Sequence, residues 1–287
     1  MNDRRTALIT GSTDGIGLTT AKNLASKGYN VIIHGRDSQR ISNAVEKVKS
    51  FAHVSSDQIY TIESDLSTVH GAKKMVQLTQ ELLEKNGLSL DVLMNNAGVF
   101  EEKHTLTEDN LELTFAVNVM APFVITSGLL SALLENKNQS RIVIASSISQ
   151  CRSIDHWDDL QFHHRSYSSH RSYSESKLFD AMLAAEFATR LTKAGYGTSK
   201  ITCNSLDPGT VNTKMLFAGW GPCGIDVDSA LDELWLCTSE DVRDISGTYF
   251  CWKSPSKSAD HYKEKERLKM WDILSTIDPD SAKQWYL

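Results

Sequence analysis

The sequence predicts an α/β protein whose parallel sheet is doubly wound, with helices on both faces. Short apolar runs alternate with longer stretches of helical periodicity, and several of the runs are nearly continuous in Val, Ile and Leu. Such runs are typical of strands buried between two layers of helices. Strand–helix alternation also favours right-handed crossovers between parallel strands.

Six segments are expected to be strands because they are short, apolar and bounded by polar residues. They are residues 7–10, 30–35, 59–62, 90–95, 141–146 and 200–205. Apolar residues recur at helical spacing between them, over 41–48, 75–82 and 178–191. Gly87 is a suitable stop for the second of these helices, and the third is expected to end near Gly195.

The whole chain, residues 1–287, is expected to form a single domain. Its length suits one large α/β domain. The sequence contains no internal repeat, low-complexity linker or proline-rich hinge. From about residue 209 onward we expect an elaborated C-terminal region.

Composition excludes several classes of protein. A net charge of −6 and a pI of about 5.9 argue against a nucleic-acid-binding surface, which needs clustered Lys and Arg. The five cysteines are odd in number and form no C-x-x-C pair, so we expect reduced thiols in a cytoplasmic protein. The N-terminal residues contain no apolar stretch of membrane-spanning length, so no integral membrane segment is expected.

Residues 148–171 are polar and rich in histidine, and are expected to form a long solvated loop. Four histidines and three aspartates in this stretch make a metal site conceivable. Their spacing fits no metal site that the ligand chemistry supports, so no metal is expected.

A glycine-rich segment, GSTDGIG (residues 11–17), joins the first strand to a helix. Glycines allow a tight turn, a close approach of the backbone to phosphate, and close packing of helix on strand. The N-terminus of the helix offers free N–H groups to a pyrophosphate. The segment therefore predicts the dinucleotide site of a Rossmann-type fold, the alternative being a turn with a structural role alone.

The end of the second strand bears on the choice of cofactor. An acid at this point would bind the ribose 2′-hydroxyl of NAD. Gly35 occupies the expected position, and Arg36 follows it, which suits a 2′-phosphate through charge-assisted contacts. NADP(H) is therefore favoured. NAD(H) remains the alternative if Arg36 is merely solvated, and Asp37 is expected to cap the next helix.

Residues 165–177, RSYSSHRSYSESK, place two tyrosines in nearly identical settings. Tyr173 has Lys177 at i+4, whereas Tyr167 has Arg171 at i+4, and such pairs share one face of a helix. A nearby lysine cation lowers the pKa of a phenol, and lysine can also reach the hydroxyls of a cofactor ribose. Tyr173 is therefore the candidate acid, the alternative being a surface pair. Tyr167 is expected to lie in the loop, near the substrate entrance.

Five motifs together resemble the short-chain dehydrogenase/reductase family. They are TGSTDGIG (10–17), SDL (64–66), NNAG (95–98), YSESK (173–177) and DPGTVNT (207–213). They occur in the family's order. The long insertion before Tyr173, the segment SKLFD after it and SGTYF (246–250) resemble the retinol dehydrogenase-like branch.

The resemblance implies the site residues. Ser147 would polarise a substrate carbonyl, and Tyr173 would donate a proton to the developing alkoxide. Lys177 would lower the pKa of Tyr173 and bind the nicotinamide ribose, and Asn118 would hold a water linking Lys177 to solvent. The expected cofactor residues, with Arg36, are Gly11, Ser12, Thr13, Asp14, Gly15, Ile16, Gly17, Asp65, Leu66, Asn96, Ala97, Gly98, Tyr173, Lys177, Pro208, Gly209, Val211 and Thr213.

The resemblance also implies an activity, namely NADP(H)-dependent interconversion of a carbonyl and an alcohol. Residues 6–205 would form the dinucleotide-binding and catalytic core, and 209–287 the substrate lid and C-terminal elaboration. In the lid, Met215, Leu216, Phe217 and Trp220 would form an apolar wall for a lipophilic substrate, unless they pack on the C-terminal helix.

Three rival functions remain open at this point. One is a regulator of the same fold that binds NADP without turnover. The others are an epimerase or dehydratase of the longer-chain branch and a light-dependent reductase of the protochlorophyllide type. The expected partner is a small-molecule carbonyl or alcohol. Because members of the family commonly form dimers and tetramers, the resemblance also implies a homodimer or homotetramer, although the C-terminal elaboration could block one such contact.

Overall fold

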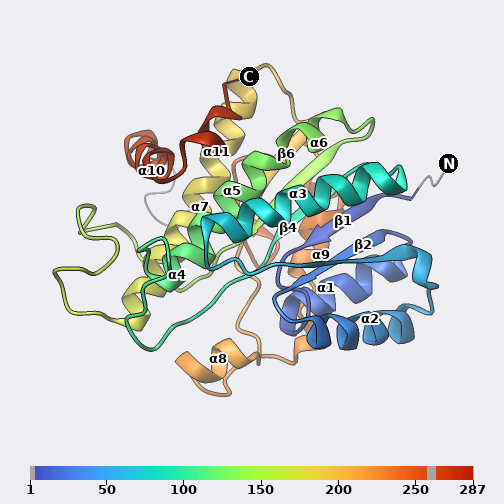
Figure 1. Cartoon of the computed structure of the whole chain (residues 1–287), viewed down its shortest axis with the longest axis horizontal. Helices are drawn as coiled ribbons and strands as arrows, with labels where there is room; N and C mark the ends of the chain where they lie inside the picture. The colour runs from blue at the N-terminus through green and yellow to red at the C-terminus, as the bar shows by residue number, and fades with distance from the viewer. Residues whose placement is uncertain (1–3, 257–262, 287) are drawn as a thin grey trace.

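One eight-stranded sheet forms the centre of the molecule (Figure 1). The computed structural model describes residues 4–256 and 263–286. The strand order is β3-β2-β1-β4-β5-β6-β7-β8, and all neighbours are parallel except β7 and β8. The strands are β1 (Thr6–Ile9), β2 (Asn30–Gly35), β3 (Ile59–Glu63), β4 (Val92–Asn95), β5 (Ser140–Ala145), β6 (Ile201–Leu206), β7 (Tyr249–Cys251) and β8 (Ser254–Pro255).

The doubly wound α/β fold and the six expected strands are confirmed. The sequence analysis did not predict β7 and β8 as strands. Both are short, with three and two residues, and two residues are too few to show periodicity.

Helices cover both faces of the sheet (Figure 1). Alternate residues of β1 face different cores: Leu8 packs in one, and Ala7 and Ile9 pack in the other. The α-helices are α1 (Gly15–Ser26), α2 (Ser38–Ala52), α3 (Val69–Asn86), α4 (Leu113–Phe115), α5 (Ala121–Gly128), α6 (Leu130–Glu135), α7 (Ser169–Lys193), α8 (Lys214–Gly219), α9 (Asp232–Thr238), α10 (Glu264–Ile277) and α11 (Pro279–Lys283).

Two helix boundaries follow the chemistry expected of them. The Asp37 side chain caps α2 by accepting a hydrogen bond from Arg40 N at 2.8 Å. Gly87 follows α3 with a φ of 61°, a left-handed conformation that favours glycine. Asp37 therefore fixes where the chain enters α2, and Gly87 fixes where it leaves α3.

The strand order reverses between β1 and β4, which is where an open α/β sheet forms its ligand crevice. The glycine-rich turn after β1 and the NNAG segment after β4 meet at this point. Asn96 Nδ2 donates hydrogen bonds to Thr10 O at 2.7 Å and Gly11 O at 3.2 Å. The topology therefore brings together two motifs that are more than 80 residues apart.

The C-terminal helices α10 and α11 cover α7 and α5 (Figure 1). The Trp285 ring stacks on Phe187 at 4.5 Å, and its Nε1 donates to Ser127 Oγ at 2.8 Å. Trp271 packs edge-on against Phe187 and Phe123. Aromatic side chains of the C-terminal region therefore occupy part of the surface of α5 and α7.

The segment before α7 differs from the expected solvated loop. Residues 148–168 contain no helix or strand, so the predicted loop is confirmed over that range. Helix α7 begins at Ser169, so the last three residues of the predicted loop are helical, and Ser168 caps the helix. The expectation that the loop is fully solvated was wrong, because Ile154, Leu160 and Phe162 are buried.

The next three statements, on a membrane-spanning helix, a metal site and disulfide bonds, apply to the described residues alone. Over 4–256 and 263–286, no helix is both long and apolar enough to cross a membrane. Within the same ranges no cluster of His, Cys, Asp and Glu has the geometry of a metal site. All five cysteines, at positions 151, 203, 223, 237 and 251, are free thiols.

Candidate active site

The glycine-rich turn forms the floor of a cavity of about 320 Å³ at the carboxyl end of the sheet. Asp14 caps α1 by accepting a hydrogen bond from Gly15 N at 2.9 Å. A Cβ atom on Gly17 would lie 2.3 Å from Asn96 Nδ2, so only glycine fits there. The turn presents the N-terminus of α1 to the cavity, where a pyrophosphate would fit.

His34 holds this turn in place from β2. Gly11 N donates to His34 Nδ1 at 3.0 Å, and His34 Nε2 bonds Ser64 O at 3.1 Å. Burial lowers the pKa of His34 to about 4, so the ring is neutral at physiological pH. The sequence analysis missed this residue, since a lone histidine in an apolar strand carries no signal of its own.

Ser12 is the one member of the glycine-rich turn that turns away from the cavity. Its hydroxyl donates to Ile9 O at 2.8 Å and accepts from His34 N at 3.0 Å. Its backbone N–H also donates to His34 O at 3.0 Å, so Ser12 braces the turn from inside and does not line the cavity, contrary to its place among the predicted cofactor residues.

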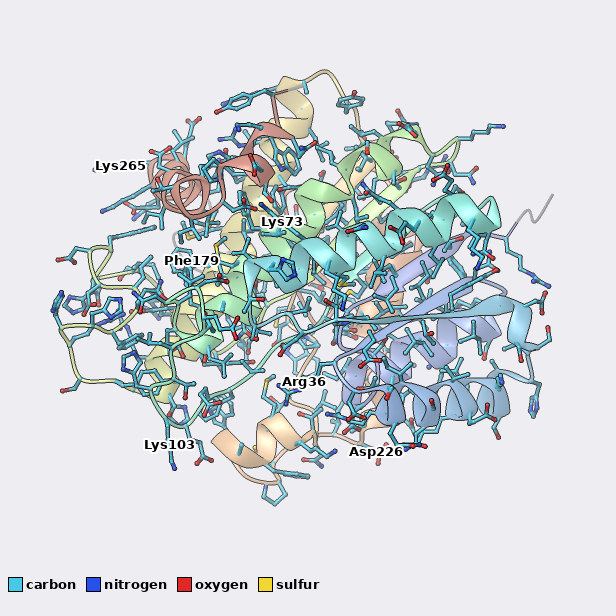
Figure 2. The ribbon with its side chains drawn as sticks, viewed as in Figure 1. Arg36, Lys73, Lys103, Phe179, Asp226 and Lys265 are labelled. Carbon is cyan, nitrogen blue, oxygen red and sulfur yellow. The ribbon has the colours of Figure 1, made fainter. Side chains whose placement is uncertain are left out.

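The far end of the cavity carries basic side chains. Arg36 and Arg40 both line it, and Figure 2 shows Arg36 at the edge of the sheet that faces α8. Asp14 pairs with Arg40 at 3.6 Å and with Lys214 of α8 at 2.6 Å. Burial opposes ionisation of Asp14, but the hydrogen bond from Lys214 and the two cations lower its pKa. Arg36 has no ion pair of its own among the described residues.

Two serines at the end of β5 have different tasks. Ser146 is buried, and its hydroxyl donates to Lys177 O at 2.6 Å, which ties β5 to α7. Ser147 lies next to the Tyr173 phenol and lowers its pKa by a hydrogen bond. The structure therefore places Ser147, the residue expected from the sequence, beside the tyrosine.

Tyr173 is buried, and burial raises the pKa of its phenol. The charge of Lys177 and the hydrogen bond of Ser147 oppose this rise, whereas the carboxylates of Asp180 and Asp207 add to it. The net effect is a raised pKa, so the phenol is protonated at neutral pH. A protonated phenol is a proton donor, as reduction of a carbonyl requires.

Lys177 is also buried, and its ammonium has well-defined partners. Its Nζ donates to Ala145 O at 2.8 Å and to Asp180 Oδ2 at 2.7 Å, and it lies 5.7 Å from the centre of the Tyr173 ring. Burial alone would lower the pKa of Lys177, but the charges of Asp180, Tyr173 and Glu233 outweigh it and raise that pKa. The side chain is therefore a fixed cation beneath the phenol.

Asn118 lies behind the cavity rather than in it. It belongs to the π-turn η2 (Ala116–Met120), and its Oδ1 accepts from Val99 N at 2.8 Å. Its Nδ2 donates to Val99 O at 3.1 Å and to Ser176 Oγ at 3.0 Å. The side chain is thus committed to protein partners, and its main role in the described structure is to join β4 to α7.

A second cavity of about 250 Å³ opens on the other side of Tyr173. Met215, Leu216 and Trp220 contribute apolar surface to it. The Trp220 ring packs against Tyr173 at 5.4 Å and Phe100 at 5.1 Å, so the alternative that it packs on the C-terminal helix is wrong. Phe217 is half exposed and does not line either cavity, which corrects its place in the predicted wall.

Most of the predicted cofactor residues surround the first cavity. They are Gly11, Thr13, Asp14, Gly15, Ile16, Gly17, Arg36, Asp65, Leu66, Asn96, Ala97, Gly98, Tyr173, Lys177, Pro208 and Thr213. Gly209 and Val211 line the second cavity, together with Ser147 and Tyr173. Tyr173 lines both cavities, so a cofactor in the first and a substrate in the second would meet at its hydroxyl.

Among the further residues of the first cavity that the sequence analysis missed are two charged ones, Arg40 and Glu233. Arg40 lies in the first turn of α2, just after the Asp37 cap, whereas Arg36 precedes the helix, so no helical spacing links the two arginines. Glu233 comes from α9, more than 200 residues from the glycine-rich turn, and is fully buried. No sequence signal marks a buried acid at that distance.

The profile of the short-chain dehydrogenase family matches residues 5–218. The chain belongs to the short-chain dehydrogenase family. It is 33% identical over 297 residues to "Retinol dehydrogenase 14" of Mus musculus, covering 95% of this chain and 85% of the relative. It is 30% identical over 283 residues to "Polyprenol dehydrogenase" of Homo sapiens, covering 93% and 83%. These relatives place it in the retinol dehydrogenase-like branch.

A solved structure agrees with this assignment. Landomycin C-6 ketoreductase, solved with bound NADP and rabelomycin, superposes with a TM-score of 0.64 at 25% identity, covering 87% of this chain and 95% of that one. The short-chain dehydrogenase described here is thus an oxidoreductase that acts on CH–OH and C=O groups with a nicotinamide dinucleotide.

Proposed function

We propose that this short-chain dehydrogenase uses NADP(H) to interconvert a lipophilic aldehyde or ketone and its alcohol, with Tyr173 as the acid and base. The single observation that carries the proposal is the position of Tyr173. It lines both cavities, is hydrogen-bonded to Ser147, and has the Lys177 cation at i+4. No other described tyrosine combines a cation, an oxyanion donor and two cavities.

The residues of the first cavity fit a dinucleotide. The glycine at position 17 leaves space that a Cβ would fill, and the N-terminus of α1 points there. Arg36 and Arg40 at the adenine end suit a 2′-phosphate, and no acid replaces Gly35 at the end of β2. The ketoreductase cited above was solved with NADP, which supports the same choice.

The proposed mechanism assigns one task to each side chain. A bound NADPH supplies the hydride. Ser147 donates a hydrogen bond to the substrate carbonyl and polarises it. Tyr173 gives its proton to the oxygen as negative charge develops there, and Lys177 stabilises the phenolate that results. In the oxidative direction Tyr173 must first lose its proton, which its raised pKa opposes.

Apolar surface in the second cavity supports a lipophilic substrate. Met215, Leu216 and Trp220 contribute side chains from α8 and the residue that follows it. The printed names of two relatives, a retinol and a polyprenol dehydrogenase, refer to lipophilic alcohols. Lipophilic aldehydes and ketones are therefore the first substrates to test.

The experiment is cofactor oxidation by the purified protein, with NADPH and NADH in parallel, across lipophilic aldehydes and ketones. We expect turnover with NADPH and about tenfold weaker use of NADH. Arg36→Ala should remove most of that preference, because a phosphate contact contributes roughly 1–2 kcal/mol. Binding of NADPH without turnover of any carbonyl would instead support the silent NADP-binding regulator.

Two further expectations remain predictions. A cytoplasmic location and association into a homodimer or homotetramer are both untested. The coverage of α5 and α7 by α10 and α11 restricts where a second copy could bind. Mass measurement in solution would decide the oligomeric state.

A further inference from the structure

Asp180 lies one helical turn beyond Lys177 on α7 and is almost completely buried. Its Oδ2 accepts the hydrogen bond from Lys177 Nζ at 2.7 Å. Its Oδ1 is buried without a hydrogen-bond partner among the described residues. Burial raises the pKa of Asp180 to about 7, and the charge and hydrogen bond of the Lys177 ammonium oppose that rise, so this ammonium is the group that stabilises the carboxylate.

Glu233 is a second buried acid that acts on the same lysine. It comes from α9, lines the first cavity, and is fully buried. Its Oε2 accepts a hydrogen bond from Thr20 Oγ1 at 2.9 Å, and its Oε1 has no partner within the described ranges. Its charge acts on Lys177 from the opposite side of the sheet to Asp180.

The two acids reduce the effect that the positive charge of Lys177 has on the ionisation of the Tyr173 phenol. An uncompensated lysine cation would stabilise the phenolate strongly, because the site is buried and its effective dielectric constant is low. Asp180 offsets that cation at 2.7 Å and also repels the phenolate directly. The phenol therefore experiences only part of the charge of the lysine.

The charged and titratable groups around the phenol come from α7, from α9 and from the segment that follows β6. Lys177 and Asp180 belong to α7, and Glu233 acts through Lys177 from α9. Asp207, which follows β6, also raises the pKa of Tyr173, and burial raises the pKa of Asp207 itself. His170, also on α7, packs edge-on against Phe100 and Trp220, and Trp220 lines the second cavity. Lys177 is the only cation among those that act on the phenol in the described structure.

We propose that Asp180 is a positioning residue that holds the Lys177 ammonium against Ala145 and compensates its charge, so that Tyr173 stays protonated and the site is set for carbonyl reduction. This rests on the function proposed above. In that step hydride passes from NADPH to the carbonyl carbon, NADPH becomes NADP⁺, and the phenol proton passes to the carbonyl oxygen. Oxidation of the alcohol needs the phenolate, and is therefore confined to higher pH.

The test is a titration of the Tyr173 phenol that does not need turnover. Tyrosinate absorbs in the near ultraviolet, and subtracting the spectrum of Tyr173→Phe isolates one of the eight tyrosines. The measurement uses the full chain with saturating NADP⁺. Asp180→Asn, subtracted from Asp180→Asn/Tyr173→Phe, should show an apparent pKa of Tyr173 lower by roughly one unit, because the Lys177 cation is no longer compensated.

Turnover gives a second readout of the same shift. Carbonyl reduction by Asp180→Asn should decline about one pH unit earlier than reduction by the wild type, and alcohol oxidation should become active at correspondingly lower pH. Asp180→Glu keeps the charge and should restore the wild-type profile. If Asp180→Asn does not fold, Asp180→Ser makes the same comparison.

Glu186→Gln is the matched control. Glu186 is another buried acid on α7, and it pairs with Arg190 and Arg267 instead of Lys177. It should lower stability but leave the titration of Tyr173 unchanged. A phenol pKa that stays constant or rises in Asp180→Asn would overturn the proposal. Absence of turnover in the wild type would count against the proposed function instead, and the spectroscopic titration would still decide the role of Asp180.

Discussion

The two RSY segments, residues 165–167 and 171–173, have the same sequence but opposite surroundings. Both arginines bind Glu175: Arg165 Nη2 lies 2.8 Å from one oxygen, and Arg171 Nε lies 2.6 Å from the other. Beyond this shared contact with Glu175, the two tyrosines have different neighbours. Tyr173 points toward the Lys177 cation and the two cavities, whereas Tyr167 points toward an anion.

The Tyr167 hydroxyl is held inside the protein surface, away from both cavities. It donates to Glu101 O at 2.8 Å and lies 3.1 Å from Glu112 Oε1. Burial and the Glu112 carboxylate raise the pKa of this phenol. Tyr167 lies in the loop before α7, as expected, and it lines neither of the two cavities. The comparison teaches that the neighbouring charge and the backbone element decide which tyrosine can act as an acid, not the local sequence.

Replacing Glu175, the acid that both arginines bind, should have the largest effect on the stability of the two RSY segments. Glu175→Gln removes the partner of both arginines, and Glu175 itself is buried. Removing one partner of a buried ion pair costs about 3 kcal/mol. We expect the free energy of unfolding, measured by urea denaturation, to fall by about that amount. A change below about 0.5 kcal/mol would show that the two segments are held by other contacts.

The lysine should matter far more for turnover than the arginine at the equivalent position. Lys177→Met removes the cation beside Tyr173, and we expect kcat/KM to fall by roughly 10²–10³-fold. Arg171→Met removes the equivalent i+4 partner of Tyr167, and we expect less than about a threefold loss of turnover. Steady-state kinetics of both variants with one substrate would check this. Equal losses would contradict the division between the two segments.

Features of the site that are local sequence patterns could be predicted from the sequence, whereas features that depend on packing between elements could not. The glycine-rich turn, the strand and helix on either side of it and the Tyr173–Lys177 pair were predictable, since each is a local pattern with a fixed spacing. Asp180 and Glu233 were not. Helix α7 is buried on nearly every side, so its sequence does not show which face meets the cavity. Glu233 reaches the cavity only because α9 packs on α1 and β5.

The insertion before α7 shows a second limit of sequence patterns. Ile154, Leu160 and Phe162 are separated by polar residues at no regular spacing, so they matched neither a strand nor a helix. Asp159 organises the segment by accepting hydrogen bonds from the backbone of His163 and His164. Contacts of this kind depend on a compact loop and leave no periodic pattern.

Above neutral pH, the pH dependence of turnover should follow Tyr173. Because the pKa of Tyr173 is raised, the phenol stays protonated through neutral pH, and its proton is lost only under alkaline conditions. Alcohol oxidation should thus rise about tenfold per pH unit below that pKa, and carbonyl reduction should fall above it. Tyr167→Phe should leave both profiles unchanged. Rate profiles in both directions, for the wild type and this variant, would test the assignment.

The smallest expected effect is on the stability of Tyr167→Phe. The substitution removes a hydrogen bond to Glu101 O and one to Glu112, but Ser172 Oγ and the N–H of Phe115 still bond to the Glu112 carboxylate. The free energy of unfolding should decrease by about 1 kcal/mol. A loss above about 3 kcal/mol would mean that Tyr167 anchors the insertion more strongly than its two contacts indicate.

The most direct test of the account is a paired measurement of turnover by Tyr173→Phe and Tyr167→Phe, with NADPH binding measured for both. The account predicts that Tyr173→Phe still binds NADPH but loses roughly 10³-fold or more in kcat, whereas Tyr167→Phe stays within about threefold of the wild type. Substantial turnover by Tyr173→Phe, or a comparable loss in Tyr167→Phe, would contradict the assignment of the catalytic acid.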